Sequence, residues 1–259
     1  MLEDELLSSG LAPGTKLASE RQLAARLGVS RPLVREALRT LVAHGLIEIV
    51  PGRGAFVRAA SSTYVARPLQ THYRRRQVTP RDLLEARLML EPAAVALACE
   101  RAEEDETAAL ASVIERFDEA AGLLEMARWD VTAHALIARM SHNPVIEATF
   151  SSVAPLIFEL LLRSLADPDV FREGAPIHHD IVGAIRARDA EAGRKAMVEH
   201  LEVARRTYGA DLDESLDFVA RRELEKLLGP AATLESILES VVVAHRPLDT
   251  LETQEILKP

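Results

Sequence analysis

Ser19-Glu20-Arg21-Gln22 and Ser30-Arg31-Pro32-Leu33-Val34-Arg35 are the two stretches that decide the fold of the N-terminal part of the chain. The first begins with a serine and has a glutamine three residues later, which is a capping box that starts a helix. That helix stops at Gly28. The second stretch begins with a serine N-cap, and Pro32 lies in the first helical turn, where a missing N–H does no harm. The spacing predicts two helices joined by a tight turn.

The residues on either side of these stretches complete a small domain. A short helix precedes them and ends at Leu6-Leu7, before Gly10 and the Pro13-Gly14 turn. Behind the second N-cap, apolar residues recur at helical spacing up to Gly45. Strands over 46–50 and 55–57 flank the turn Pro51-Gly52-Arg53-Gly54. Residues 1–58 are therefore predicted to form three helices and a β-hairpin, a winged helix-turn-helix.

The rest of the chain is predicted to be helical. Hydrophobic residues make up 48% of the 259 residues and aromatic residues only 4%, which favours packed helices over sheet. Thr79-Pro80 starts a helix with a kink or break at Pro92. Further helices are expected at about 105–126, 129–141, 145–165, 174–187 and 189–207, and no strand signal appears. The prediction is an antiparallel all-helical bundle over 79–210, after a linker over 59–78.

The C-terminal segment, residues 211–259, is predicted to be an extension of unassigned role. Two helices are conceivable in it, Leu216 to Leu228 and Leu234 to Val243, separated by Gly229-Pro230. The single cysteine, Cys99, excludes an intramolecular disulfide framework and fits a reducing compartment. The acidic start of the chain and the lack of an apolar run near ~18 residues predict a soluble, cytoplasmic protein with no membrane partner.

The charge is unevenly distributed along the chain. Residues 1–76 hold 12 Lys/Arg against 6 Asp/Glu, a net +6, whereas the remainder holds 19 against 34, a net −15, within a total of −9. A basic head on an acidic body is expected when only one end meets a polyanion such as nucleic acid.

The second predicted helix of the turn motif carries an arginine stripe. Arg31, Arg35 and Arg39 follow i, i+4, i+8 spacing, opposite the apolar face. An arginine stripe alone also fits a solvated surface. Here it follows a capped helix and a turn, an arrangement that places this helix in the DNA major groove. Arg21 is expected at a phosphate, and Arg53 at the hairpin tip is expected in the minor groove.

One acidic and three imidazole side chains in the helical part are candidate metal ligands. Asp130 and His134 lie at i, i+4, on one helical face, while His178 and His200 lie on later helices. Such a set suits Zn, Ni, Fe or Mn. Surface or capping histidines are the alternative. His142 is expected to be exposed.

The N-terminal residues resemble the winged-helix signature of the GntR family. The resemblance runs from Pro13 through Leu38 and continues in Gly45-Leu46-Ile47 and Gly52 to Val57, so it spans about residues 5–58. It implies that Arg21, Arg31 and Arg35 contact an operator and that Gly54 approaches the minor groove. The complete set of candidate DNA contacts is Arg21, Ser30, Arg31, Arg35, Arg39, Arg53 and Gly54.

Residues 79–207 resemble the ligand-binding domain of the fatty-acid-regulator (FadR) subfamily of that family, called FCD. The resemblance rests on Glu85 to Pro92 and on an Asp-x-x-x-His, His, His pattern that Asp130, His134, His178 and His200 meet. It implies a bound divalent metal and a carboxylate-bearing effector, and it favours His178 over the adjacent His179 as the ligand. Asn143 matches an asparagine of the family. Arg87 is a candidate for the effector's carboxylate, with a salt bridge to Glu91 as the alternative.

These features predict a homodimeric transcriptional repressor rather than an enzyme. The effector would bind at the metal and change the affinity for a two-fold operator. Two alternatives use the same residues: a helical domain that serves dimerisation without a ligand, and a metallohydrolase, for which no general base is evident.

Overall fold

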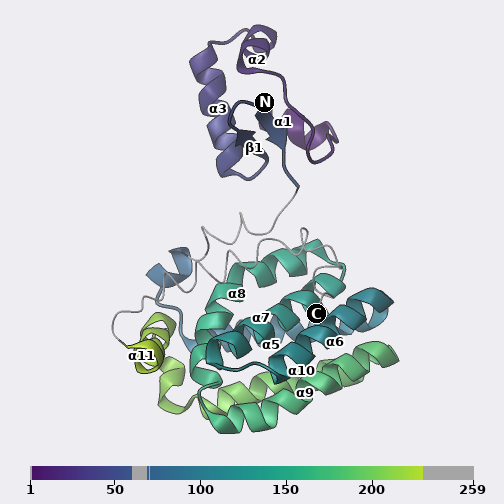
Figure 1. Ribbon diagram of the computed structural model, residues 1–259, viewed down its shortest axis with the longest axis vertical. Helices are drawn as coiled ribbons and strands as arrows, with labels where there is room; N and C mark the ends of the chain where they lie inside the picture. Colours follow the sequence, from purple (N-terminus) through teal and green to yellow (C-terminus); the bar gives the residue numbers. More distant parts are fainter. Residues whose placement is uncertain (1, 60–68, 70, 230–259) are drawn as a thin grey trace. The chain divides into compact units, whose positions relative to one another are not determined.

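The computed structural model describes residues 2–59, 69 and 71–229, and the chain divides into two compact units, Met1–Val65 and Ala66–Pro259 (Figure 1). Most of the predicted linker's first half, residues 60–68 and 70, lies outside the described residues. The conceivable helix from Leu234 to Val243 lies outside them as well.

The N-terminal unit contains the predicted three helices and hairpin. Its elements are α1 (Leu2–Ser8), α2 (Glu20–Leu27), α3 (Arg31–Ala43), β1 (Ile47–Val50) and β2 (Gly54–Val57). The capping box forms as expected: the Ser19 hydroxyl accepts from the backbone N–H of Gln22, and the Gln22 side chain accepts from the backbone N–H of Ser19 at 3.0 Å. Gly28 ends α2 at a φ of 66°, which is left-handed backbone that favours glycine.

A small apolar core holds this unit together. β1 pairs with β2 in antiparallel fashion, with Ile47 opposite Val57. The buried side chains are Leu23, Ala24, Val34, Leu38, Leu41 and Ile47. The segment before α2 joins the hairpin, because the Leu17 N–H donates to the carbonyl of Ala55 and the Val57 N–H donates to that of Thr15, both at 2.8 Å. This third, strand-like partner was not predicted from the sequence.

The second unit is the predicted helical bundle. Its elements are α5 (Pro80–Arg101), α6 (Glu104–Asp118), α7 (Leu123–Met140), α8 (Pro144–Ser164), α9 (Pro168–Ala187), α10 (Ala190–Thr207), the 3₁₀ turn η1 (Gly209–Asp213) and α11 (Leu216–Leu228). α5 continues without a break through Pro92 to Arg101. The helix Leu216–Leu228 in the C-terminal segment is present as the sequence suggested.

Two predicted helix boundaries in this unit were wrong. The run expected over 105–126 is divided, because α6 ends at Asp118 and Gly122, in extended backbone, serves as the N-cap of α7. α9 begins at Pro168 instead of residue 174. Asp167 caps it by accepting from the Asp169 N–H at 3.0 Å, and Pro168 takes the first helical position.

The helices pack closely around two apolar clusters. α10 lies against α5 and α9, and α7 lies against α5, α6 and α8. The α5–α10 crossing is tight at Gly193, where a β-carbon would stand 3.0 Å from Cys99 Sγ and 3.4 Å from a methyl of Val95. α11 packs on α8, and its side chains Leu216, Val219, Ala220 and Leu224 are buried in the second cluster.

α8 is the most apolar helix among the described residues. It alone among them is long and apolar enough to cross a membrane, with a mean hydropathy of 1.7 over its most apolar window. Half of that window is buried inside the unit, as in the core helix of a soluble bundle. Length and composition alone are weak grounds for a membrane span.

Candidate metal centre and nucleic-acid interface

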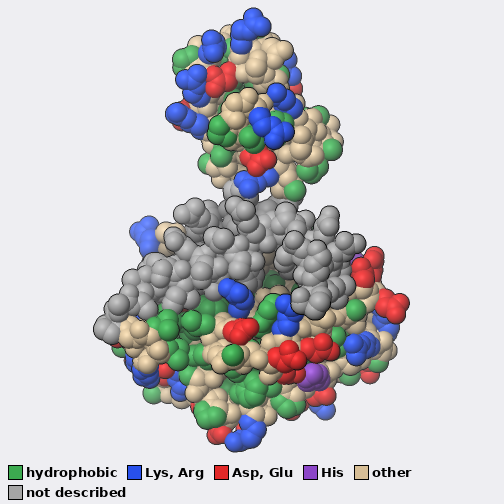
Figure 2. All heavy atoms as spheres, in the orientation of Figure 1, with side chains coloured by type: hydrophobic (Ala, Val, Ile, Leu, Met, Phe, Trp, Pro, Cys, Tyr) green, Lys and Arg blue, Asp and Glu red, His purple; other side chains and the backbone are tan. Residues whose placement is uncertain are grey.

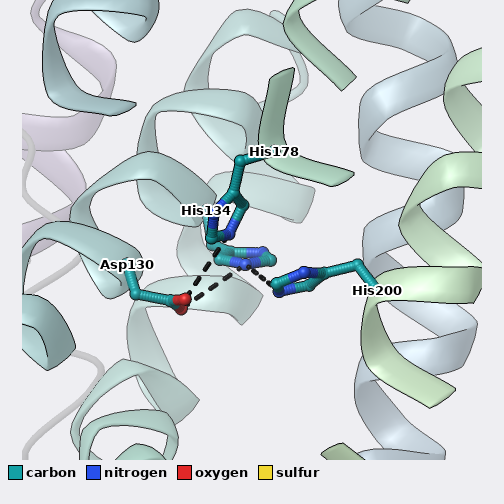
Figure 3. Close-up of side chains that lie close together, drawn as sticks. All are labelled: Asp130, His134, His178 and His200. Atoms are coloured by element: carbon teal, nitrogen blue, oxygen red, sulfur yellow. Dashed lines mark hydrogen bonds and ion pairs between the residues drawn. The ribbon is translucent and has the colours of Figure 1, made fainter. Parts of the chain in front are cut away.

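The four candidate metal ligands come together from three helices. Asp130 and His134 lie one turn apart on α7, His178 projects from α9 and His200 from α10 (Figure 3). One ligand atom from each residue lies within 4.8 Å of the ligand atoms of the other three. The structure therefore brings together all four residues that the sequence singled out, across 70 residues of chain.

Short distances connect the members of this cluster. His134 Nε2 lies 3.2 Å from His200 Nε2 and 3.5 Å from Asp130 Oδ1, and His178 Nε2 lies 3.4 Å from Asp130 Oδ2. Asp130, His134 and His178 are buried, and His200 is partly buried. Phe117 packs against the His178 ring edge to face, at 4.9 Å between centroids. The donor atoms thus converge at a largely buried site.

Several buried polar atoms of the cluster lack hydrogen-bond partners. Asp130 Oδ1, both ring nitrogens of His178 and Nδ1 of His200 have none among the described residues. An unpaired buried polar atom is costly, and native folds pair nearly all of them. A divalent cation would accept a lone pair from one atom of each residue, so the residues fit a bound metal ion.

The electrostatics favour the ligand forms of these side chains. Burial opposes ionisation of Asp130, but the nearby imidazoles of His178 and His134 hold its pKa below the usual range. Burial and the neighbouring imidazoles His178 and His134 hold the pKa of His200 well below its ordinary value. Asp130 is therefore a carboxylate and His200 a neutral imidazole, the forms that bind metal.

A second carboxylate, Glu91 on α5, contacts His134 at the ring nitrogen that does not face the cluster. Glu91 accepts hydrogen bonds from Arg87 Nε at 2.5 Å and Nη2 at 3.3 Å, and its Oε2 lies 2.5 Å from His134 Nδ1. Although burial opposes its ionisation, Arg87 and His134 lower the pKa of Glu91 to about 2. Of the two roles open to Arg87, the structure shows the salt bridge to Glu91. The contact of Glu91 with His134 was not predicted.

A small cavity adjoins the cluster. Asp130, His178 and His200 line it together with Arg87 and, on the other side, apolar side chains that include Phe117 and Phe171. Its volume is about 20 Å³, room for about one water molecule. Ser164 also lines the cavity; its hydroxyl oxygen is buried and has no hydrogen-bond partner among the described residues.

Other residues singled out from the sequence lie apart from the cavity lining. Asn143 is the N-cap of α8, and its side chain accepts from the N–H of Val145 at 3.0 Å. His179 pairs with Asp118 at 2.9 Å on the exposed side of α9, away from the ligand cluster. His142 pairs with Glu106 at 2.9 Å, and its side chain is 40% exposed. A metal role for His178 and not for His179 agrees with this arrangement.

The arginine stripe lies on the exposed face of α3. Arg31, Arg35 and Arg39 are all solvent-exposed, and the buried side chains of the helix are Val34, Leu38 and Leu41. Ser30 caps the helix by accepting from the Leu33 N–H at 3.4 Å. Arg21 is exposed in the first turn of α2. Figure 2 shows Lys and Arg side chains spread over the visible face of this unit.

Two of the arginines that are candidate DNA contacts are in contact with neighbouring side chains. Arg35 is held in a fork by Glu20 of α2, with Nε 3.1 Å from Oε1 and Nη2 2.9 Å from Oε2. In the hairpin, the Arg53 guanidinium lies 5.6 Å from the centre of the Phe56 ring. Gly54 has a φ of 112°, which disfavours any side chain, and a β-carbon there would stand 3.2 Å from Lys16 Cε.

A winged helix-turn-helix with an exposed arginine stripe, followed by a helical bundle with a cluster of candidate metal ligands, is typical of a DNA-binding transcriptional regulator. Comparison with known proteins identifies the family of regulators to which the chain belongs. The family model described as "Bacterial regulatory proteins, gntR family" matches residues 1–57, and the model described as "FCD domain" matches residues 82–203. The chain belongs to the GntR family and is of its FCD-type, FadR-like kind.

Individual relatives are also named as regulators. A protein of Escherichia coli K12 named for regulation of the L-lactate dehydrogenase operon is 34% identical over 206 residues, which cover 76% of this chain and 79% of that protein. The transcriptional regulator LutR of Bacillus subtilis is 29% identical and covers 74% and 90%. A solved GntR structure from Streptococcus agalactiae has a TM-score of 0.64 at 26% identity, covering 80% and 96%. Regulators of this family bind operator DNA, and FCD domains bind small effectors.

Proposed function

We propose that this chain is a repressor whose affinity for its operator is set by a small carboxylate bound at a divalent metal ion. Asp130, His134, His178 and His200 would hold the ion, and residues 79–210 would be the sensing domain. The observation that carries the proposal is the convergence of these ligand atoms within 4.8 Å, several of them without hydrogen-bond partners.

The donor set supports an ion of the Zn, Ni, Fe or Mn class. Three imidazoles and one carboxylate leave open positions on an ion that prefers five or six ligands. When bound, such an ion supplies a Lewis-acidic centre for an anionic oxygen of the effector. The chain itself supplies the imidazoles, the anchoring carboxylate and the apolar wall around Phe117.

The effector we propose is a small 2-hydroxycarboxylate. A relative is named for an L-lactate dehydrogenase operon, and lactate has adjacent carboxylate and hydroxyl oxygens that suit two open metal positions. The cavity of about 20 Å³ is smaller than such a ligand, so side chains around it must move on binding. Arg87 lines the cavity and remains a proposed effector contact, and Asn143 remains one from the resemblance.

At the other end, α3 would lie in the major groove. Arg31, Arg35 and Arg39 would meet base edges and phosphates, with Ser30 at the start of the helix. Arg21 would contact a phosphate, and Arg53 with Gly54 would enter the minor groove. Two copies in a homodimer would read half-sites about one helical turn apart, in the cytoplasm where such DNA is found.

Metal analysis joined to operator titration tests this proposal. The purified protein should hold about one divalent ion per chain, and L-lactate or a related hydroxy acid should change operator affinity by roughly 5- to 150-fold. The effect should disappear after the ion is removed by chelation and return when it is restored. Protein that binds the operator but holds no ion and ignores all such acids would support a bundle that serves dimerisation alone.

A further inference from the structure

Ser164, in the last turn of α8, has a buried hydroxyl group without a hydrogen-bond partner. The residue is 0% exposed, and no described residue bonds to its Oγ atom. In the described part of the chain, the other buried side-chain atoms without a partner all belong to the four residues of the ligand cluster. A buried hydroxyl that bonds to nothing is costly, so its presence here requires a reason.

The helix that carries Ser164 does not supply a partner for its hydroxyl. Serine and threonine hydroxyls within a helix commonly donate to a carbonyl one turn earlier. Ser152 of α8 does so, because its Oγ donates to the carbonyl of Thr149 at 2.7 Å. The carbonyl four residues before Ser164 is that of Leu160, and it accepts from the Tyr208 hydroxyl at 2.9 Å. Together with the N–H bond of the helix itself, this contact uses both lone pairs of the Leu160 oxygen.

The Ser164 hydroxyl lies at the cavity of the ligand cluster. Three residues of the cluster line this cavity together with Ser164, from α7, α9 and α10. Arg87 is the other polar residue that lines it, and its guanidinium already donates to Glu91. The rest of the lining is apolar. A ligand oxygen that enters this cavity would therefore meet Ser164 as a donor that makes no competing bond.

We propose that Ser164 binds the effector, by donating a hydrogen bond to the carboxylate oxygen that the metal ion leaves free. This inference rests on the proposed function, in which a 2-hydroxycarboxylate places one carboxylate oxygen and its hydroxyl oxygen on the ion. The second carboxylate oxygen is then buried and needs a donor. A hydroxyl bonded to a buried carboxylate makes a strong, charge-assisted hydrogen bond. Ser164 thereby selects carboxylates by a contact separate from the metal.

Isothermal titration calorimetry of the full chain loaded with Zn²⁺ tests this role, with L-lactate, glycolate and acetate as the probes. Ser164→Ala should lower the affinity for a bound acid by about 10- to 100-fold, because a hydrogen bond to a charged group is lost. Ser152→Ala is the matched control, since Ser152 is a buried serine of the same helix that does not line the cavity. It should bind the acid as the unaltered protein does, and all three proteins should hold the same amount of zinc.

The melting temperature of the acid-free protein separates a binding role from a structural one. Ser164→Ala should melt no lower than the unaltered protein, because the hydroxyl it removes bonds to no described residue and alanine favours a helix. A hydroxyl that stabilised the bundle would instead lower the melting temperature when removed.

Two results would overturn the role of Ser164 alone. One is an equal affinity of Ser164→Ala and the unaltered protein for a bound acid, and the other is a clear loss of stability in acid-free Ser164→Ala. A different result refutes the proposed function and this role together: unaltered, zinc-loaded protein that binds none of the three acids. The two failures are therefore distinguished by the unaltered protein itself.

Discussion

Glu91 Oε2 lies 2.5 Å from His134 Nδ1, on the edge of the ring away from the Nε2 atom that faces Asp130 and His200. Because the Glu91 carboxylate can only accept, Nδ1 must carry the ring proton. In the neutral ring Nε2 then carries the lone pair, and this atom faces Asp130 and His200. A carboxylate behind a ligand histidine fixes both its tautomer and its orientation, and so raises the affinity for metal.

Removing the charge of Glu91 should therefore weaken metal binding. We expect Glu91→Gln to lower the affinity for Zn²⁺ by about 10- to 100-fold, since this is the usual effect of such supporting groups. Competition with a chromophoric chelator measures it. Glu115→Gln serves as the control, and equal affinities of the two variants would contradict the role assigned to Glu91.

The Arg87–Glu91 pair should behave differently when broken and when replaced. Arg87→Met leaves Glu91 buried without its main cation and should cost about 3–5 kcal/mol of unfolding free energy in metal-free protein. The double variant Arg87→Met, Glu91→Met should recover part of that loss, because no charge is left unpaired, although His134 Nδ1 loses its partner Glu91. Urea unfolding followed by circular dichroism measures both. A double variant less stable than the single one would argue against this account.

Adjacent histidines on α9 offer a matched test of the ligand set. His178→Ala should reduce bound metal from about one ion per chain to a small fraction, because one of four ligands is lost. His179→Ala should leave metal content unchanged, since His179 pairs with Asp118 on the exposed side. Elemental analysis of the two purified proteins decides the matter. Loss of metal in both, or in neither, would mean that the cluster is not the binding site.

Arg35 should contribute to operator binding without supporting the fold. Its side chain is exposed and is held by Glu20, so Arg35→Ala should leave the melting temperature nearly unchanged. If the guanidinium meets a guanine, the variant loses about 1–3 kcal/mol of operator affinity. A gel-shift titration at fixed salt measures this, with the exposed Arg172→Ala of α9 as the control. Unaltered binding by Arg35→Ala would remove α3 from the proposed interface.

The hairpin glycine should be intolerant of a side chain. Gly54→Ala places a β-carbon at a φ of 112° and 3.2 Å from Lys16 Cε, so the N-terminal unit should lose about 1–3 kcal/mol of stability. Gly122→Ala, where φ is not positive and no atom lies within 4 Å, should cost far less. Differential scanning calorimetry of both variants compares them. Equal melting temperatures of the two variants would show that the hairpin accommodates a side chain at residue 54.

Local signals predicted most of the fold. Ser19 with Gln22, and Ser30 with Pro32, mark helix starts by side-chain chemistry that acts over three residues, and both helices begin there. The boundary at Gly122 was missed because the helix-favouring residues on either side hide a break that only packing reveals. The pairing of residues 15–17 with β2 was missed because it depends on contacts forty residues apart.

The four residues of the candidate metal cluster could be predicted from the sequence. The residues on other helices that contact them could not. Asp130 and His134 share a helical face by spacing alone, and the chemistry of His178 and His200 singled them out. Glu91 reads in the sequence as an i, i+4 partner of Arg87, and nothing local shows that it reaches His134. Glu159 is an isolated acid in an apolar helix, and its partner Arg74 lies 85 residues earlier. Such contacts exist only once the helices are packed.

The close approach of α5 and α10 at Gly193 has a consequence for evolution of the sensor. Glu91 lies on α5 and His200 on α10, so the distance between the proposed metal site and the carboxylate behind it depends on how closely these two helices approach at Gly193. A lineage could retune the width of the site, and with it the choice of ion or acid, by exchanging residues at 193 and 99 while every ligand stays the same. A comparison of related sequences that considers only the metal-ligating residues would not detect such changes at residues 193 and 99.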